Sequence, residues 1–376
     1  MPFEVQTCPK CGAMITPNLA RCRQCKTFLH GNRFEGALFE RLLPEGLSQH
    51  PGTGLMVITL FAYYGLMIAL AGVDSVLGLS PYAIRQLGGV TSLGVLQGEY
   101  WRFATGMMGH AGIVHLFFNL YVLTVVGPLV EEIFDRKKMM IIFIVGGVLA
   151  MVASFGVSTL VFGQINRTTI GASGGTCALL GACLIGARRR GAGAEHIVRT
   201  MTQWSAFMLL FGLAVPGVDN AAHIGGWLVG AGLAAAFPLG LNATFVLNQL
   251  YSAIIVTLLA GLAASAGFMV LDVQKYGATL EADAHGRRFL FFEYAEGKKP
   301  EYSSQMILAQ KCRSQWQAWS DGRETSARTK AIDICERARR AWPAQPNSYR
   351  ALAILYEDAE QPEQVQKNLL ALEWLR

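Results

Sequence analysis

The sequence has few charged residues. Asp, Glu, Lys and Arg make up 15% of the 376 residues, whereas hydrophobic residues make up 52%. A soluble globular protein carries about 25% charged residues, so this composition excludes a soluble enzyme and a disordered scaffold. The formal net charge of +6 is small for this length and excludes a strongly basic nucleic-acid-binding protein. The chain is therefore predicted to be a membrane protein that binds no nucleic acid.

The few charges are unevenly spread, and their distribution predicts three parts. Residues 51–273 hold 18 charged residues in 223, whereas residues 274–376 hold 30 in 103. Residues 1–50 hold 10 charged residues and four of the eight cysteines. We expect a polar head over 1–50, a membrane domain over 51–273 and a polar tail over 274–376. The head lacks an apolar run long enough for a secretory signal, so the amino terminus is expected in the cytoplasm.

The membrane domain divides into apolar stretches near the roughly 20 residues needed to cross a bilayer. The longest, Asn220 to Leu271, contains no Asp, Glu, Lys or Arg, and Pro238 with Gly240 predicts a break inside it. The predicted spans are Gly54–Val73, Ala111–Val130, Met139–Ile165, Gly171–Ala187, Thr200–Val218, Ala221–Phe237 and Leu250–Leu271. The fold class is thus an all-α integral membrane protein with a bundle of six transmembrane helices plus a seventh.

Basic residues in short loops predict the orientation, because they favour the cytoplasmic side. Arg136-Lys137-Lys138 lies between spans two and three, and Arg188-Arg189-Arg190 lies between spans four and five. Both loops are then cytoplasmic, in agreement with a cytoplasmic amino terminus. An odd number of spans places the tail on the outer side.

Polar residues inside the spans predict the functional site, because a polar group in hydrocarbon is costly. His115 and Asn119 in span two are one helical turn apart and so share a face. Ser173 lies at the start of span four, and His223 lies at the start of span six. In the predicted orientation these four residues lie at one depth, near the outer face.

A serine with a histidine favours nucleophilic catalysis, in which the imidazole takes the hydroxyl proton and the alkoxide attacks a carbonyl. Glycines around Ser173 would let its backbone N–H groups reach a nascent oxyanion at the helix amino end. His115 and Asn119 would add two donors. No third catalytic residue is evident, so we expect a dyad. Small residues at four-residue spacing would let spans four and six approach closely: Gly174, Ala178 and Ala182 in one, and Gly226, Gly230 and Ala234 in the other.

These motifs together resemble those of rhomboid intramembrane serine proteases, in family order across nearly the whole membrane domain. The matching segments are Glu99-Tyr-Trp101-Arg102, His110 with His115 and Asn119, Gly127-Pro-Leu-Val-Glu131, Gly171-Ala-Ser173-Gly174, and Ala222-His223-Ile-Gly-Gly226-Trp-Leu-Val-Gly230. One departure is Phe103-Ala-Thr-Gly106, where relatives often carry another histidine. That departure concerns the first outer loop and leaves the dyad untouched.

The resemblance implies that Ser173 is the nucleophile and His223 the general base, with His115, Asn119 and the Ser173 amide as the oxyanion hole. It implies hydrolysis of transmembrane protein substrates near the outer face of the bilayer, with no metal or cofactor in catalysis. Structural support is expected from His110, Trp101, Arg102, Glu131, Gly171, Gly174, Gly226 and Gly230. The expected location is the bacterial inner membrane, although organelles also hold such cores.

Other interpretations of these residues stay open. Trp101 and Arg102 are also typical anchors at a membrane interface, and Glu131 is a candidate partner for backbone groups at a helix end. His115 with Asn119 also fits a hydrogen-bonded pair between helices. For the whole protein, the alternative is a catalytically inactive rhomboid-like protein that binds membrane clients. Transport has little support, because no intramembrane carboxylate or lysine lines a route.

The head predicts a structural zinc site. Cys8-Pro-Lys-Cys11 and Cys22-Arg-Gln-Cys25 form two C-x-x-C pairs with ten residues between them, a pattern that resembles small zinc ribbons. Four thiolates around one tetrahedral Zn²⁺ leave no open position, so the metal would stabilise the fold of the head. A redox-active dithiol is the alternative interpretation.

The tail is predicted to be helical and partly similar to tetratricopeptide repeats. Apolar residues recur at spacings of three and four over Ala331–Ala338, Tyr349–Tyr356 and Val365–Leu375. This is fewer than the three repeats that usually make a stable array, so a peptide-binding module and a helical cap stay equally open. Head and tail are the candidate surfaces for protein partners. The tail also contains Cys312 and Cys335, and their spacing does not decide whether they form a disulfide. In span four, Cys177 and Cys183 are expected to be buried packing residues.

Overall fold

The structure is a computed structural model, and it describes residues 6–8, 10–15, 22, 24–25, 49–164, 167–215, 217–240, 245–276, 303–341 and 345–374. These residues are almost entirely helical, which confirms the predicted all-α fold class. The chain forms two compact units. The first unit comprises Met1–Tyr64, Met107–Ser154 and Gly171–Ala263, and the second comprises Gly65–Gly106, Phe155–Ile170 and Ala264–Arg376.

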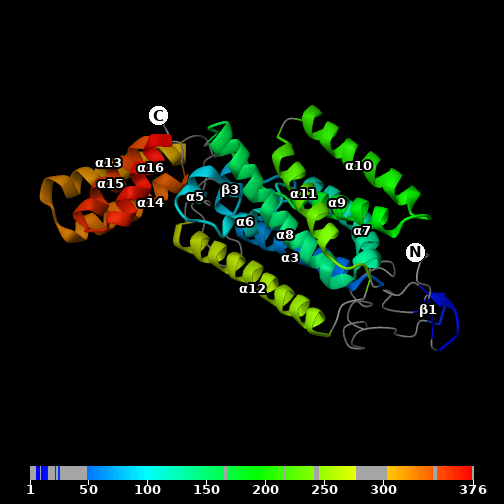
Figure 1. Ribbon diagram of the computed structural model, residues 1–376. Coiled ribbons are helices and arrows are strands. Elements are labelled where there is room, and N and C mark those ends of the chain that lie inside the picture. Colours follow the sequence, from blue (N-terminus) through cyan, green and yellow to red (C-terminus); the bar gives the residue numbers. More distant parts are fainter. Residues whose placement is uncertain are drawn as a thin grey trace. The chain divides into compact units, whose positions relative to one another are not determined.

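Each predicted span overlaps one long helix (Figure 1). These helices are α3 (Pro51–Ala71), α7 (Ile113–Phe134), α8 (Arg136–Phe155), α9 (Ser173–Arg190), α10 (Glu195–Ala214), α11 (Asn220–Ala236) and α12 (Phe245–Tyr276). Among the described residues, five of the helices are long and apolar enough to cross a membrane, namely α3, α7, α8 with the π-helical turn η2 (Gly156–Val161), α10 and α12. Helix α9 carries three arginines in its last turn, and α11 has 17 residues. The chain is thus an integral membrane protein.

Helix α9 lies at the centre of the first unit, where it packs against α7, α10 and α11. A Cβ atom added to Gly226 would lie 2.1 Å from the carbonyl oxygen of Gly174, and one added to Gly230 would lie 1.9 Å from that of Ala178. Both pairs have the same offset in sequence (226 − 174 = 230 − 178). The backbones of α9 and α11 therefore touch and run parallel, and the two predicted stripes of small residues face each other.

Basic side chains satisfy helix carboxyl ends at one end of the first unit. Lys138 is fully buried, and its ammonium group donates hydrogen bonds to the carbonyl oxygens of Phe134 (2.8 Å) and Gly240 (2.6 Å). Arg189 donates to the carbonyl oxygen of Phe237 at 2.7 Å. Cations are favoured at this end of a helix, where the last carbonyls lack partners.

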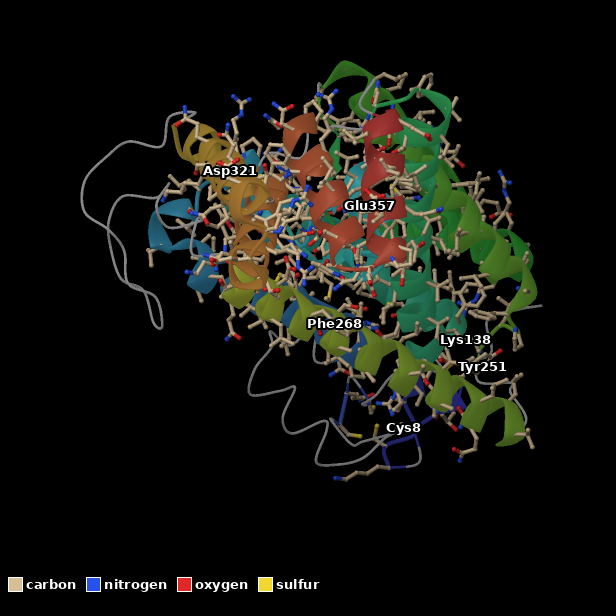
Figure 2. All side chains as sticks on the ribbon, turned by 90° about the vertical axis from the view of Figure 1, so that its left-hand side faces the viewer. Cys8, Lys138, Tyr251, Phe268, Asp321 and Glu357 are labelled. Atoms are coloured by element: carbon tan, nitrogen blue, oxygen red, sulfur yellow. A yellow bond between two sulfur atoms is a disulfide. The ribbon has the colours of Figure 1, made fainter. Side chains whose placement is uncertain are left out.

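The structure corrects the predicted loop between spans two and three. Only Asp135 separates α7 from α8, with a φ of 100°, and the basic residues 136–138 form the first turn of α8. Asp135 pairs with Lys138 at 2.9 Å. Figure 2 shows Lys138 beside Tyr251 of α12, with the ammonium nitrogen 5.7 Å from the ring centroid. The charged residues between the two spans favoured a loop from the sequence, but in the structure they end α7 and begin α8.

In the second unit, the segment between α3 and α7 folds into short elements. These are η1 (Val73–Ser75), α4 (Pro81–Gln86), β3 (Val90–Thr91), α5 (Ser92–Leu96) and the start of α6 (Arg102–Met108). Strand β3 pairs antiparallel with β4 (Thr168–Thr169). Ser80 starts α4 by accepting a hydrogen bond from the backbone N–H of Ala83 at 3.1 Å, and Pro81 fits the first helical position.

The tail consists of two helical hairpins in the part that the structure describes. Helix α13 (Ser303–Gly322) packs against α14 (Thr325–Ala341), and α15 (Pro346–Asp358) packs against α16 (Pro362–Trp374). Helix α13 adds a helix that the apolar spacing had not revealed. Cys312 of α13 and Cys335 of α14 form a disulfide. In the head, β1 (Gln6–Thr7) pairs antiparallel with β2 (Met14–Ile15).

Candidate active site

Ser173 is the first residue of α9 and is partly buried. Ala172 precedes it at the N-cap position, and no side chain caps the helix. The backbone N–H groups of the first turn are donors without intrahelical partners, and Gly174 and Gly175 add no side chains of their own over them. This helix end therefore favours a developing negative charge beside the Ser173 hydroxyl.

His223 lies in the first turn of α11 and is 6% exposed. Asp219 caps this helix, because its carboxylate accepts a hydrogen bond from the backbone N–H of Ala222 at 3.1 Å and a second from the Ser154 hydroxyl of α8. The carbonyl oxygen of Asp219 accepts from the backbone N–H of His223 at 3.0 Å. Nδ1 of His223 is buried and has no hydrogen-bond partner among the described residues. The helix start thus fixes the backbone of His223, and Nδ1 of its ring has no partner among the described residues.

The ring of His115 lies against the backbone of Gly171, two residues before Ser173. A Cβ atom on Gly171 would lie 2.7 Å from Cε1 of His115, and Gly171 has a φ of +135°, so only glycine fits there. His110 packs edge-on against His115 with ring centroids 5.1 Å apart. The side-chain amide of Asn119 donates to the carbonyl oxygen of His115 at 2.9 Å, which leaves its second N–H free for another acceptor.

The amino ends of α7, α9 and α11 converge at the end of the first unit opposite the basic side chains. The His115 ring lies against Gly171 just before α9, and Gly174 touches Gly226 one turn after His223. No hydrogen bond joins the Ser173 hydroxyl to the His223 ring within the described segments. Such bonds are often long before a substrate binds. The arrangement offers a hydroxyl, an imidazole and several N–H donors, which is the set that acyl transfer requires.

Glu131 lies at the opposite end of α7, where it caps another helix. It is 2% exposed, and its carboxylate accepts from the backbone N–H groups of Gly52 (3.0 Å) and Thr53 (2.9 Å) at the start of α3. The Thr53 hydroxyl also donates to it at 2.9 Å. A carboxylate at a helix amino end is favourable. Glu131 therefore holds α3 in place at a helix end, far along α7 from His115.

Arg102 is a buried hub of the second unit. It is 5% exposed, and its guanidinium group donates to the carbonyl oxygens of Arg85 (2.6 Å) and Gly89 (3.0 Å) and to the carboxylate of Glu99 (2.5 Å). The guanidinium carbon lies 4.6 Å from the ring centroid of Trp101. Arg102 therefore ties the segment between α3 and α7 together, and the interpretation as an interface anchor is wrong for it.

The four cysteines of the head form one cluster. Their sulfur atoms all lie within 4.8 Å of one another, with Cys8 and Cys25 3.5 Å apart and Cys11 and Cys22 3.6 Å apart. A tetrahedral Zn²⁺ with Zn–S distances of about 2.3 Å requires sulfur atoms about 3.8 Å apart. The cluster therefore matches the size of a metal site with four thiolate ligands.

Sequence reasoning missed Ser154 and Asp219 as supports of the site. Asp219 directly precedes a helix, which is a capping signal, so its role was accessible. Ser154 was not, because a lone serine in an apolar span gives no sign of its partner. At one end of the first unit, the structure brings together the α9–α11 contact and four predicted site residues, namely His110, His115, Asn119 and Gly171. Glu131 lies apart from them, at the other end of α7. Trp101 and Arg102 belong to the second unit.

Sequence comparison relates the membrane domain to known proteins. Residues 97–240 match the rhomboid domain. The chain is 31% identical to rhomboid protease GluP of Bacillus subtilis (strain 168) over 278 residues, which cover 70% of this chain and 50% of that protein. It is 32% identical over 171 residues to the mitochondrial RHOMBOID-like protein 6 of Arabidopsis thaliana, with 41% of this chain and 49% of the relative covered. It is 27% identical over 183 residues to rhomboid protease AarA of Providencia stuartii, with 44% and 65% covered. The chain spans about half the length of the first two relatives.

Proposed function

The chain belongs to the rhomboid family, and on this premise we propose that it is an intramembrane serine endopeptidase that cleaves transmembrane proteins. Ser173 would attack the scissile carbonyl after the ring of His223 has taken its proton, and the same ring would then protonate the leaving amine. Water would hydrolyse the acyl-enzyme in a second step. The observation that carries the proposal is the convergence of an uncapped helix end at Ser173 with the buried His223 through the parallel glycine contact of α9 and α11.

The oxyanion hole would combine the backbone N–H of Ser173 with the side chains of His115 and Asn119. The close approach of His115 to Gly171 supports this role, since it brings the ring within two residues of the nucleophile. Asn119 would contribute the N–H that is not engaged with the His115 carbonyl. His110 would support His115 by packing against its ring.

We also propose an orientation. The basic side chains at the carboxyl ends of α7, α9 and α11 would face the cytoplasm, and the end that carries Ser173 would face outward. The head would then be cytoplasmic and the tail outside, in the inner membrane of a bacterium. A disulfide between Cys312 and Cys335 supports an outer tail, because disulfides persist in oxidising compartments.

We propose that residues 1–50 form a head stabilised by Zn²⁺, that residues 51–273 form the protease domain and that residues 274–376 form the tail. Cys8, Cys11, Cys22 and Cys25 would hold the metal as four thiolates, with no position left for a substrate. Zinc would supply folding free energy to a segment too short to bury a large core.

The test is cleavage of a tagged transmembrane reporter by the purified protein in liposomes, with Ser173→Ala and His223→Ala as variants. Labelling by a fluorophosphonate, which reacts with an activated serine hydroxyl, gives a readout that needs no substrate. We expect the wild type to cut the reporter near the outer face and to be labelled, and both variants to do neither. Equal cleavage by wild type and Ser173→Ala would exclude Ser173 as nucleophile. Absence of both cleavage and labelling in the wild type would instead favour an inactive protein that binds membrane clients.

A further inference from the structure

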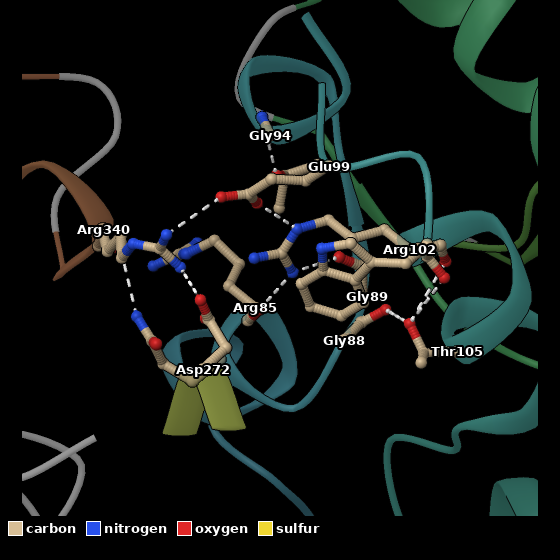
Figure 3. A network of polar contacts seen from close by, with 12 residues as sticks. Arg85, Gly88, Gly89, Gly94, Glu99, Arg102, Thr105, Asp272 and Arg340 are labelled. Carbon is tan, nitrogen blue, oxygen red and sulfur yellow. Dashed lines mark hydrogen bonds and ion pairs between the residues drawn. The ribbon is translucent and has the colours of Figure 1, made fainter. Parts of the chain in front are cut away.

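A network of ion pairs in the second unit joins the tail to the segment between α3 and α7 (Figure 3). Arg340, in the last turn of α14, lies 3.5 Å from Oε1 of Glu99 and forms an ion pair with Asp272 near the end of α12. The other carboxylate oxygen of Glu99 accepts from Nε of Arg102 at 2.5 Å. All three partners are largely buried, since the side chains of Arg340, Glu99 and Asp272 are 15%, 14% and 12% exposed. One carboxylate is thus shared by two guanidinium groups from distant parts of the chain.

An apolar contact lies beside this network. Tyr349 of α15 is fully buried in a cluster with Leu93 of α5 and Ala371 of α16. The side-chain amide of Gln86 donates to the carbonyl oxygen of Arg340 at 3.2 Å. A buried apolar centre bordered by buried ion pairs is the composition of a specific interface, because each buried charge requires its partner in one geometry. The tail therefore docks on this segment in a defined manner.

The charges of the network explain why Glu99 stays ionised. Burial by itself raises the pKa of Glu99, but the positive charges of Arg102, Arg340 and Arg339 outweigh it and lower the pKa to about 2. A carboxylate with two guanidinium partners also fixes the position of each. Because Arg102 holds the carbonyl oxygens of Arg85 and Gly89, a shift of Glu99 reaches the whole segment through Arg102.

We infer that the tail is a built-in positioning element for residues 81–106, and that Arg340 is the positioning residue that couples them. The matched rhomboid domain begins at residue 97 and so includes Glu99, Trp101 and Arg102, whereas Arg340 lies outside it. The tail would therefore hold part of the protease from outside the catalytic domain. An effect of the tail on substrate cleavage rests on the proposed protease function. The ordering of residues 81–106 by the tail does not depend on that function.

Hydrogen exchange of the full-length protein in liposomes tests the structural statement. Arg340→Gln should speed amide exchange in residues 81–106 by about tenfold or more, since it leaves Glu99 and Asp272 with one cation fewer. Arg337→Gln is the matched control, because Arg337 lies one turn earlier on α14 and pairs within that helix with Asp333 at 3.0 Å. Unchanged exchange in residues 81–106 of Arg340→Gln would overturn the inference.

A second variant keeps the test valid if Arg340→Gln unfolds the tail. Asp272→Asn removes one anchor of Arg340 while leaving the sequences of the tail and of residues 81–106 intact. It should speed exchange in residues 81–106 with little change inside α13 and α16, and its effect should not add to that of Arg340→Gln. Full additivity of the two effects would mean that the residues act independently, which would contradict the inference.

Cleavage kinetics test the functional statement. Arg340→Gln should raise KM for the transmembrane reporter and leave kcat within about twofold, because Ser173 and His223 belong to the first unit, whereas the residues of the network belong to the second. Arg340→Lys keeps the charge and should restore part of both the exchange protection and KM. Faster exchange with an unchanged KM would refute the functional part. Fluorophosphonate labelling of Ser173 should persist in every Arg340 variant, so loss of the dyad would be recognised separately.

Discussion

Substitution of Gly226 by alanine tests whether close contact between α9 and α11 sets the geometry of the site. The new Cβ atom would lie 2.1 Å from the carbonyl oxygen of Gly174, the residue that follows Ser173. Contacts shorter than 3.0 Å are essentially not tolerated, and the obstacle here is backbone, which has no rotamer to change. The two helices must therefore separate by at least 0.9 Å (3.0 − 2.1) at this level.

The expected cost follows from that separation. Extra volume in a well-packed interior costs about 1–3 kcal/mol of folding free energy, partly offset by the higher helix propensity of alanine, about 1 kcal/mol. Activity should suffer more, because a displacement of about 1 Å in a reacting group can cost about 100-fold in rate. We therefore expect Gly226→Ala to unfold at a slightly lower temperature and to cleave about 100-fold more slowly.

The assay is reporter cleavage in liposomes with thermal unfolding of the same preparations. Gly232→Ala is the matched control, since Gly232 lies on the same helix and a Cβ atom there would meet nothing within 4 Å. This control should match the wild type in rate and be equally or slightly more stable. If Gly226→Ala cleaves within twofold of Gly232→Ala, the glycine contact does not position Ser173 and His223, and the reasoning fails.

Two further predictions concern the electrostatic network and the head. The pKa of Glu99 is about 2 in the folded protein against an ordinary 4.5, so its ion pairs should contribute about 3 kcal/mol of folding free energy above pH 5. That contribution should be lost as the pH falls from about 4.5 towards 2. The unfolding temperatures of wild type and Glu99→Gln should therefore converge as the pH is lowered from 7 to 3. A constant difference between the two unfolding temperatures over this range would contradict the prediction. In the head, Cys22→Ser should abolish the zinc that elemental analysis finds in the wild type. The control is Lys10→Ala, on the exposed turn between Cys8 and Cys11, which should retain about one zinc per chain. Equal zinc in the two variants would exclude the cluster as the metal site.

The sequence predicted features that depend on local pattern. Uncharged stretches located the helices, and the spacing of small residues on spans four and six anticipated the contact of Gly174 with Gly226. It could not predict the burial of Lys138 or Arg102, because a buried cation is stable only with partners that lie far away in the chain. The carbonyl of Gly240 and the loop around Gly89 are such partners. The docking of Tyr349 on Leu93 has the same character, since more than 250 residues separate the two.

The amino ends of α9 and α11 lie at the same end of the first unit, but only α11 has a side-chain cap. Asp219 caps α11 and Glu131 caps α3, so both amino ends have their N–H groups satisfied by carboxylates. Only charge-free Ala172 precedes α9, although an aspartate or serine there would stabilise the helix by about 1 kcal/mol. A cap at that position would occupy the N–H groups that an oxyanion needs and would place a negative charge where one must develop. Helices α7 and α10 also begin without a side-chain cap, at Gly112 and Ala194. At Ser173 the uncapped start of α9 leaves N–H groups available for the oxyanion of the proposed protease reaction.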